Sequence, residues 1–126
     1  MRQRKWLWIA PLILVLILAL WLLVTPPRWW LNVTKRVDLT DPVATGQTLV
    51  LEYNCRRCHQ VDGSGAMLAG NLMGVTDRMS NEAIADLLRD PDSARPNTSK
   101  PNLRISDSQI EAITVYLRSI DQAAPD

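Results

Sequence analysis

The chain has 126 residues, of which 47% are hydrophobic, and its formal net charge at pH 7 is +1. All thirteen acidic residues follow residue 31, where ten Lys and Arg accompany them, so this part is formally −3. Such a balance excludes a nucleic-acid-binding protein, because that class needs a surplus of basic residues to contact phosphates.

The N-terminal stretch from Trp6 to Val24 contains no charged residue and follows three basic residues within the first five. Its 19 residues would form a helix of about 28 Å, close to the ~30 Å hydrocarbon core of a bilayer. All five Trp precede residue 31, and Trp29 and Trp30 lie just beyond the stretch, as aromatic residues at a membrane interface do. The sequence therefore predicts a single transmembrane helix.

Residues 1–24 are interpreted as a cytoplasmic tail and an uncleaved signal anchor. The alternative is a cleaved signal peptide, which has a shorter apolar core and a small-residue cleavage site, whereas Val24-Thr25-Pro26-Pro27 follows here. Residues 25–41 are expected to be a linker, because the Pro pair ends the helix and Asp41-Pro42 provides the N-cap and first position of the next one. Residues 42–126 would then form a separate domain.

The segment Cys55-Arg56-Arg57-Cys58-His59 contains both Cys and the only His of the chain. Two thiols three positions apart, followed directly by an imidazole, form the attachment pattern of c-type haem. Cys55 and Cys58 would each form a thioether to one haem vinyl group, and His59 would bind the iron as the proximal ligand. The alternatives for such a Cys pair are a redox dithiol, half of a zinc site or a disulfide. A zinc site would need a fourth ligand from a carboxylate or a partner, and no βαβ pattern of thioredoxin-like proteins surrounds the motif.

The domain over 42–126 contains no Trp or Phe, so its own side chains offer only a small apolar core. Domains of this size usually need a staple, and one buried, covalently held haem c would supply it. Haem c is attached outside the cytoplasm. The motif therefore predicts a single-pass protein of a bacterial inner membrane, with its N-terminus inside and its haem domain on the periplasmic, extracytoplasmic side.

Three helices are predicted in this domain, and no segment alternates with the period of a strand. The first is expected over Pro42–Asn54. The second begins after Ser80 as N-cap and ends before Pro91. The third begins after Ser106, which forms a capping box with Gln109, and its apolar residues follow helical spacing. The predicted fold class is thus all-α, with long irregular connections of the kind that wrap around a ligand.

From about Val43 to Ile120 the chain resembles the class I monohaem cytochromes c, small electron carriers with three to four short helices around a haem. Gly46, followed by the Cys-x-x-Cys-His motif, is similar to the family's first helix and attachment site. The resemblance implies that Gly46 lets this helix pass closely over an aromatic residue of the last helix, here Tyr116. Members often carry a Pro where this chain has Gly70, so we expect the carbonyl that orients the proximal imidazole to be held less rigidly.

In this family a Met binds the opposite face of the iron from a loop of the type Pro-x-Thr-x-Met-Pro. The matching stretch is Pro96-Asn97-Thr98-Ser99-Lys100-Pro101, in which Lys100 occupies the position of the Met. The resemblance thus implies Lys100 as the second iron ligand through its neutral amine. It also implies a low reduction potential, because an amine favours ferric iron more than a thioether does. Met67, Met73 and Met79 are alternative ligands. A further alternative is that the iron has no second protein ligand or takes one from a partner.

The function expected from these features is single-electron transfer by a membrane-anchored c-type cytochrome. It would act as a subunit or tethered partner of a membrane respiratory or photosynthetic complex. The expected partners are the membrane, the subunits of such an embedded complex, or other cytochromes. No catalytic acid or base is evident, so the chain is interpreted as an electron-transfer protein rather than an enzyme. Two alternatives stay open: a haem-based sensor of small ligands, and a structural haem subunit away from the electron path.

Overall fold

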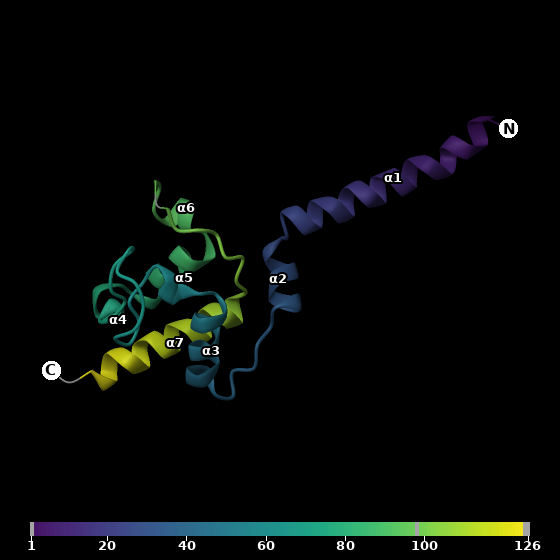
Figure 1. Ribbon diagram of the computed structural model, residues 1–126. Coiled ribbons are helices and arrows are strands. Elements are labelled where there is room, and N and C mark those ends of the chain that lie inside the picture. The colour runs from purple at the N-terminus through teal and green to yellow at the C-terminus, as the bar shows by residue number, and fades with distance from the viewer. Residues whose placement is uncertain (1, 98, 125–126) are drawn as a thin grey trace.

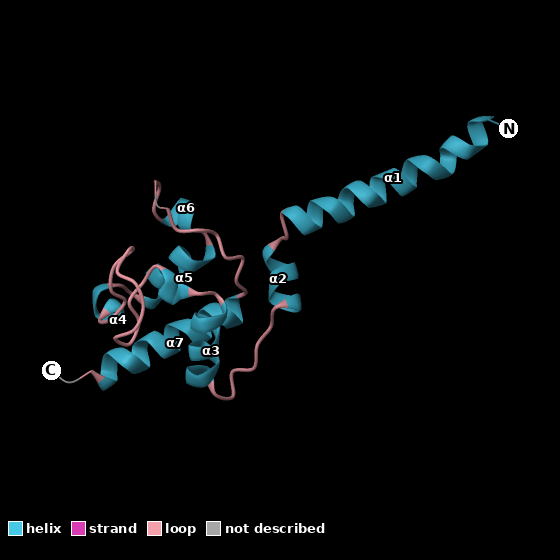
Figure 2. Cartoon of the chain, viewed as in Figure 1, coloured by secondary structure: helices cyan, strands magenta, loops and turns pink. Residues whose placement is uncertain are grey.

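The computed structural model describes residues 2–97 and 99–124, and within these ranges every helix or strand element is helical (Figure 1 and Figure 2). In chain order the elements are α1 (Arg2–Val24), α2 (Arg28–Thr34), α3 (Pro42–Glu52), the 3-10 turn η1 (Cys55–Arg57), α4 (Val75–Arg78), α5 (Asn81–Arg89), α6 (Pro91–Ala94) and α7 (Asp107–Ala123). The predicted all-α fold class is therefore confirmed.

Helix α1 extends away from the rest of the chain, whereas α3 to α7 gather into one domain (Figure 1). Its stretch Trp6–Val24 has a mean hydropathy of 2.9, and none of that stretch is buried against another element. By length and composition this helix can cross a membrane, a property that it shares with signal sequences. The predicted N-terminal apolar helix is thus present.

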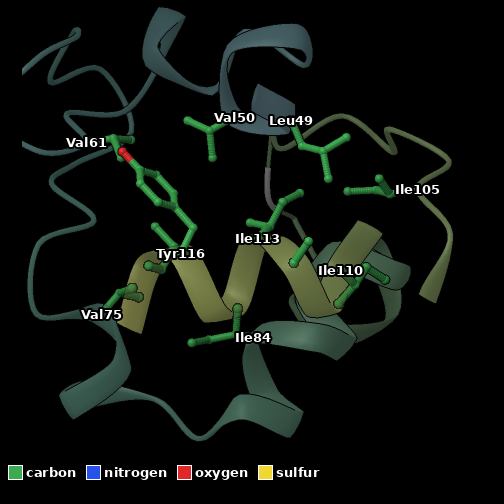
Figure 3. Close-up of a cluster of buried hydrophobic side chains, with 11 residues drawn as sticks. Leu49, Val50, Val61, Val75, Ile84, Ile105, Ile110, Ile113 and Tyr116 are labelled. Atoms are coloured by element: carbon green, nitrogen blue, oxygen red, sulfur yellow. The ribbon is translucent and has the colours of Figure 1, made fainter. Parts of the chain in front are cut away.

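Helices α3 and α7 cross closely at the centre of the domain. A Cβ atom placed on Gly46 of α3 would lie 2.1 Å from the carbonyl oxygen of Ala112 and 2.6 Å from Cβ of Tyr116. A larger side chain would force the helices apart, so the expected passage of Gly46 against Tyr116 is confirmed. Buried apolar side chains surround this crossing (Figure 3): Leu49, Val50, Val61, Val75, Ile84, Ile105, Ile110, Ala112, Ile113, Tyr116 and Leu117.

The helix starts that the sequence predicts are confirmed by their caps. The Asp41 carboxylate accepts a hydrogen bond from the backbone N–H three positions on, at 3.0 Å. The Ser80 hydroxyl does the same at the start of α5, at 3.2 Å. Ser106 and Gln109 form the capping box of α7, with both reciprocal bonds present. Each cap satisfies backbone donors that the first turn of a helix leaves without partners.

The structure departs from the predicted elements in two places within the domain. α3 ends at Glu52 rather than at Asn54, since Asn54 adopts a left-handed backbone conformation with φ 53° and turns the chain into η1. The four-residue helices α4 and α6 were not predicted, because one turn is too short to display a 3.6-residue apolar period. α6 begins on Pro91 with Asp90 as its N-cap, so the Pro that ends α5 also starts the next helix.

The segment 25–41, expected as a linker, contains the seven-residue helix α2. Leu31 of this helix is buried, with 6% of its surface exposed. Arg28 and Asn32 donate hydrogen bonds to Asp107 at the start of α7, from positions 79 and 75 residues earlier in the chain. The segment is therefore attached to the domain rather than extended away from it. Partners so far apart in the chain leave no local pattern that could have revealed them.

Candidate haem site

The turn η1 presents the Cys-x-x-Cys-His motif directly after α3. Cys55 opens the turn and is half-buried, whereas Cys58 follows the turn and is exposed. Both are free thiols, and their sulfur atoms stand for the thioether sulfurs of a haem-bound protein. The backbone N–H groups of Cys58 and His59 donate to the Cys55 carbonyl, at 3.2 and 3.0 Å. This tight turn keeps both sulfurs and the imidazole on one short segment.

The His59 ring is oriented by a backbone carbonyl. Its Nδ1 lies 3.2 Å from the carbonyl oxygen of Gly70. When Nδ1 carries the proton it donates this bond, and the lone pair of Nε2 is then available for a metal. Gly70 has φ +94°, a value that Pro cannot adopt. Gly70 thus orients the imidazole through its carbonyl, in a backbone conformation that Pro could not adopt at this position.

The surroundings of His59 favour its neutral form. Burial lowers the pKa of His59, the hydrogen bond to the Gly70 carbonyl raises it, and the nearby Lys100 ammonium lowers it again, so that the net direction is downward. A neutral imidazole is the form that binds a metal. The site therefore stabilises the protonation state that ligation requires.

The loop after the motif is fastened to it through the backbone. The N–H groups of Ala66 and Ala69 donate to the carbonyls of Arg56 and Cys58, at 2.9 and 2.7 Å. A Cβ atom on Gly65 would lie 2.3 Å from the carbonyl oxygen of the motif's His, and the φ of Gly65 is +114°. The sequence placed this Gly in an irregular connection and did not reveal its contact with the motif, because a Gly in a loop is a weak signal.

Lys100 lies beside the attachment motif, on the segment that follows α6, and its side chain is half-buried. Burial raises the pKa of the Cys55 thiol, and the nearby Lys100 ammonium acts in the opposite direction. In turn, burial lowers the pKa of Lys100, against the effect of the Cys55 and Cys58 sulfurs. Thioether sulfurs carry no charge, so in the haem-bound protein that opposing effect is absent. Of the matching stretch, Thr98 lies outside the described residues.

The three Met residues that compete for the same role occupy different places. Met67 is 60% exposed on the loop fastened to the motif. The Met73 carbonyl accepts a hydrogen bond from Arg78 at 2.8 Å. Met79 packs against the core, and the Arg95 guanidinium lies 3.7 Å from its sulfur. Among these three, Met79 is the one that packs, partly buried, against the hydrophobic core.

A cavity of about 470 Å³ opens beside Met79. Residues of α5, of α6 and of the segments next to them line it: Arg78, Met79, Ser80, Ala83, Asp86, Leu87, Ala94 and Arg95. The lining combines the apolar Met and Leu side chains with two Arg and one Asp, and none of the residues of the attachment motif is part of it.

The donor set also fits a haem better than a metal ion held by protein ligands alone. Within residues 2–97 and 99–124, no cluster of three or more His, Cys, Asp or Glu could hold an ion. A tetrahedral zinc site therefore lacks its ligands in the described part of the chain. Two thiols and one oriented imidazole are, by contrast, the set that covalent haem attachment needs.

Comparison with known proteins leads to the same assignment. The family model described as Cytochrome c matches residues 43–121, which is more than half of the chain. No curated protein and no solved structure matched the chain. The matched region contains the attachment motif, the crossing of α3 and α7, and Lys100. The chain therefore belongs to the cytochrome c family, as a class I electron-transfer protein with covalently bound haem c, whose attachment motif Cys55 and Cys58 fit.

Proposed function

We propose that this chain is a membrane-anchored cytochrome c that passes single electrons to or from a membrane-embedded electron-transfer complex or another cytochrome. α1 is its uncleaved anchor, with the N-terminus in the cytoplasm and the haem domain on the periplasmic side of a bacterial inner membrane. The apolar stretch of α1, which is not buried against the domain, supports the anchor. The family match begins at residue 43, well after this stretch.

The residues proposed to hold the haem are Cys55, Cys58 and His59. The haem supplies a one-electron redox couple when bound. The two sulfurs would hold it covalently, and His59 Nε2 would bind its iron, while the Gly70 carbonyl accepts the hydrogen bond from Nδ1. The loop bonded to Arg56 and Cys58 leads to Gly70, whose carbonyl contacts the imidazole. These residues bind and orient the haem, and the proposal requires no proton transfer from any of them.

The proposed sixth ligand is the Lys100 amine, and one observation supports this assignment above the others. The chain returns after α6 to place Lys100 close enough to Cys55 and His59 for its charge to act on both. An amine ligates only when neutral, and deprotonation of an ordinary Lys at pH 7 costs about 4.6 kcal/mol. Burial lowers the pKa of Lys100 and so reduces this cost. The iron bond must supply the remainder.

A ligand exchange tests the assignment. The substitution Lys100→Met is expected to raise the midpoint potential, because a thioether stabilises ferrous iron relative to an amine. The matched control is Lys100→Arg, which keeps the positive charge but has no neutral amine to offer. It should lose the six-coordinate spectrum without gaining that of a Met-ligated haem. An unchanged potential and optical spectrum in both variants would remove Lys100 from the iron. If the six-coordinate haem spectrum were instead lost in Met79→Leu, the second iron ligand would be Met79.

The sensor alternative is separated by the response to a small ligand. An electron carrier with a retained sixth ligand should keep its ferrous spectrum when carbon monoxide is added at neutral pH. Rapid binding of carbon monoxide to the reduced wild-type protein would favour a haem-based sensor. Alkaline extraction of membranes tests the anchor, since a protein held by α1 stays with the lipid and a peripheral protein is released.

A further inference from the structure

Helix α2 has two faces of different character, although it is only seven residues long. Positions three and four apart lie on the same side of a helix. One face consists of Arg28, Leu31 and Asn32, continued by Lys35 just after the helix, and we call it the inner face. The opposite face consists of Trp29, Trp30 and Val33, and we call it the outer face.

The inner face is bonded to the start of α7 and the residues before it. The Arg28 guanidinium donates to the Ile105 carbonyl at 2.9 Å and also pairs with the Asp107 carboxylate. Asn32 forms two bonds to the same residue: its Nδ2 donates to the Asp107 carboxylate at 2.6 Å, and its Oδ1 accepts from the Asp107 backbone N–H at 2.8 Å. Buried Leu31 lies between these two polar residues in the helix.

The attachment continues beyond the end of α2. Lys35 Nζ donates to the Arg104 carbonyl at 3.0 Å, and the Lys35 carbonyl accepts from the Ser106 hydroxyl at 2.7 Å. The Val37 N–H donates to the Ser108 hydroxyl at 3.2 Å. Side-chain bonds spread along ten residues restrict rotation far more than one contact would. The segment 28–37 is therefore a fixed part of the domain.

The outer face carries large apolar side chains that no element of the described chain covers. Trp29 is 62% exposed, Trp30 is 40% exposed and Val33 is 72% exposed. The two indole rings stand edge to face, with their centroids 5.7 Å apart. Only three residues separate this helix from the end of α1, so the outer face follows closely, along the chain, a helix that can cross a membrane.

A hollow of about 240 Å³ lies where α1, α2 and the domain meet. It combines apolar side chains from the end of α1 and from α2 with two basic residues, and its lining is Leu22, Leu23, Pro26, Trp30, Leu31, Thr34, Lys35 and Arg104. Apolar walls beside basic groups match the chemistry of a phospholipid, which joins an anionic phosphate to hydrocarbon chains.

We propose that the outer face of α2 lies in the headgroup layer of an anionic phospholipid membrane, and that the inner-face contacts thereby hold the haem domain in one orientation relative to that membrane. This inference rests on the proposed anchoring by α1. Tryptophan prefers this layer, because its ring is apolar and its N–H is polar. Arg104, whose exposed side chain lines the hollow, then faces lipid phosphates, while the Lys35 ammonium stays bonded to the domain.

One consequence concerns the way in which the haem meets its partner. A domain on a flexible linker samples many orientations and exchanges electrons only in some of them. A domain fixed through α2 presents the same haem edge at the same height above the membrane. Its partner must then hold its own cofactor at a matching height, as a membrane-embedded complex does.

The orientation is tested on the full chain with its haem, in stacked and aligned bilayers that contain phosphatidylglycerol. The electron paramagnetic resonance signal of the ferric haem should change with the angle between the bilayers and the magnetic field. In the double variant Trp29→Ser, Trp30→Ser this dependence should be lost, although the haem spectrum stays intact. The control Leu51→Ser, which changes a side chain of α3 that is 53% exposed, should keep it. The inner-face variant Asn32→Ala should weaken it.

A second measurement locates the outer face without disturbing it. In the variant Trp6→Phe, Trp8→Phe, Trp21→Phe, the only indoles left are those of α2. Lipids brominated near the headgroup should quench their fluorescence, and lipids brominated at the chain end should quench it less. Absence of quenching by either lipid would mean that this face lies outside the lipid, which overturns the inference.

The outcomes separate this inference from the anchor on which it rests. A wild-type haem signal without angular dependence, in protein that resists alkaline extraction, overturns the fixed orientation and leaves the anchor intact. A double variant with full wild-type dependence also overturns it. Release of the wild-type protein by alkaline extraction overturns the anchor and this inference together.

Discussion

The two sides of the haem site are built in different ways. On the proximal side the backbone positions His59, through the Gly70 carbonyl and the bonds that fasten the following loop. On the distal side Lys100 stands on a segment set by its two ends, α6 with its Asp90 cap and the fully buried Ile105. The proposed fifth ligand, His59, is therefore held by the fold. The proposed sixth ligand, Lys100, depends on a single side chain, which can be exchanged with less disturbance.

The substitution Gly65→Ala should disturb the proximal side most. The new Cβ would lie 2.3 Å from the His59 carbonyl oxygen, at a φ of +114° that L-residues rarely adopt. Backbone strain and overpacking together predict a loss of about 2–6 kcal/mol in the free energy of unfolding. Denaturant titration of the ferric protein, followed by haem absorbance, measures it.

The control for that substitution is Gly63→Ala. Gly63 also has a positive φ, +70°, but a Cβ there would meet no atom within 4 Å. Only the conformational cost is then expected, about 1 kcal/mol. Equal losses in the two variants would mean that the contact with the motif contributes nothing.

On the distal side, Lys100→Ala should cost less than Gly65→Ala. Removing one half-buried side chain from a loop leaves the backbone of the site in place, so we expect a loss of about 1–2 kcal/mol. The ferric haem spectrum should nevertheless change from that of a six-coordinate iron with an amine ligand to that of an iron with a weaker ligand or none in its place. A loss as large as that of Gly65→Ala would contradict the contrast between the two sides.

Acid should release the distal ligand before it affects the proximal one. Burial lowers the pKa of Lys100 in the folded protein below its ordinary value, so the unfolded chain binds the proton more readily. Ligation therefore contributes stability at high pH, and this contribution is lost as the pH falls through the lowered pKa. A ferric low-spin to high-spin change on acidification, absent from Lys100→Ala, is the expected signature. The same change in both proteins would assign it to another group.

The smallest effect is expected from Asp90→Ala, at the far end of the distal segment. Asp90 accepts hydrogen bonds from the N–H and hydroxyl of Ser93, at 3.4 and 2.7 Å. Removal of an N-cap costs about 1 kcal/mol, and here the helix has only one turn. Thermal unfolding should shift slightly while the haem spectrum stays unchanged. A spectral change as large as that of Lys100→Ala would mean that the buried Ile105 end alone does not hold Lys100 in place.

Local chemistry explains which features the sequence predicted. Capping at Ser80 and Ser106 is encoded within four residues, and the attachment motif within five. The close passage at Gly46 followed from the resemblance to the cytochromes c, since a single Gly in a helix does not name its neighbour. The assignment of Lys100 as an iron ligand, which the same resemblance implied, stays a prediction.

The features that escaped prediction depend on contacts between distant residues. α2 has no side-chain N-cap, and its apolar residues lie on both faces, so neither capping nor periodicity indicates it. Its stability comes from Asp107, which sequence alone marks only as an acidic residue in the first turn of α7. Burial by itself would raise the pKa of Asp107, but hydrogen bonds from Asn32 and Arg28 outweigh it and lower the pKa.

The bonds between α2 and the start of α7 also bear on how the protein matures. Arg28 and Asp107 are 79 positions apart, and the attachment motif lies between them, so α2 finds its partner only after most of the chain has been synthesised. Closing so long a loop costs entropy that grows with its free length. A haem joined to the middle of the loop ties that middle down beforehand. Attachment of the cofactor should therefore precede docking of α2, and assembly should proceed from the centre of the chain towards its ends.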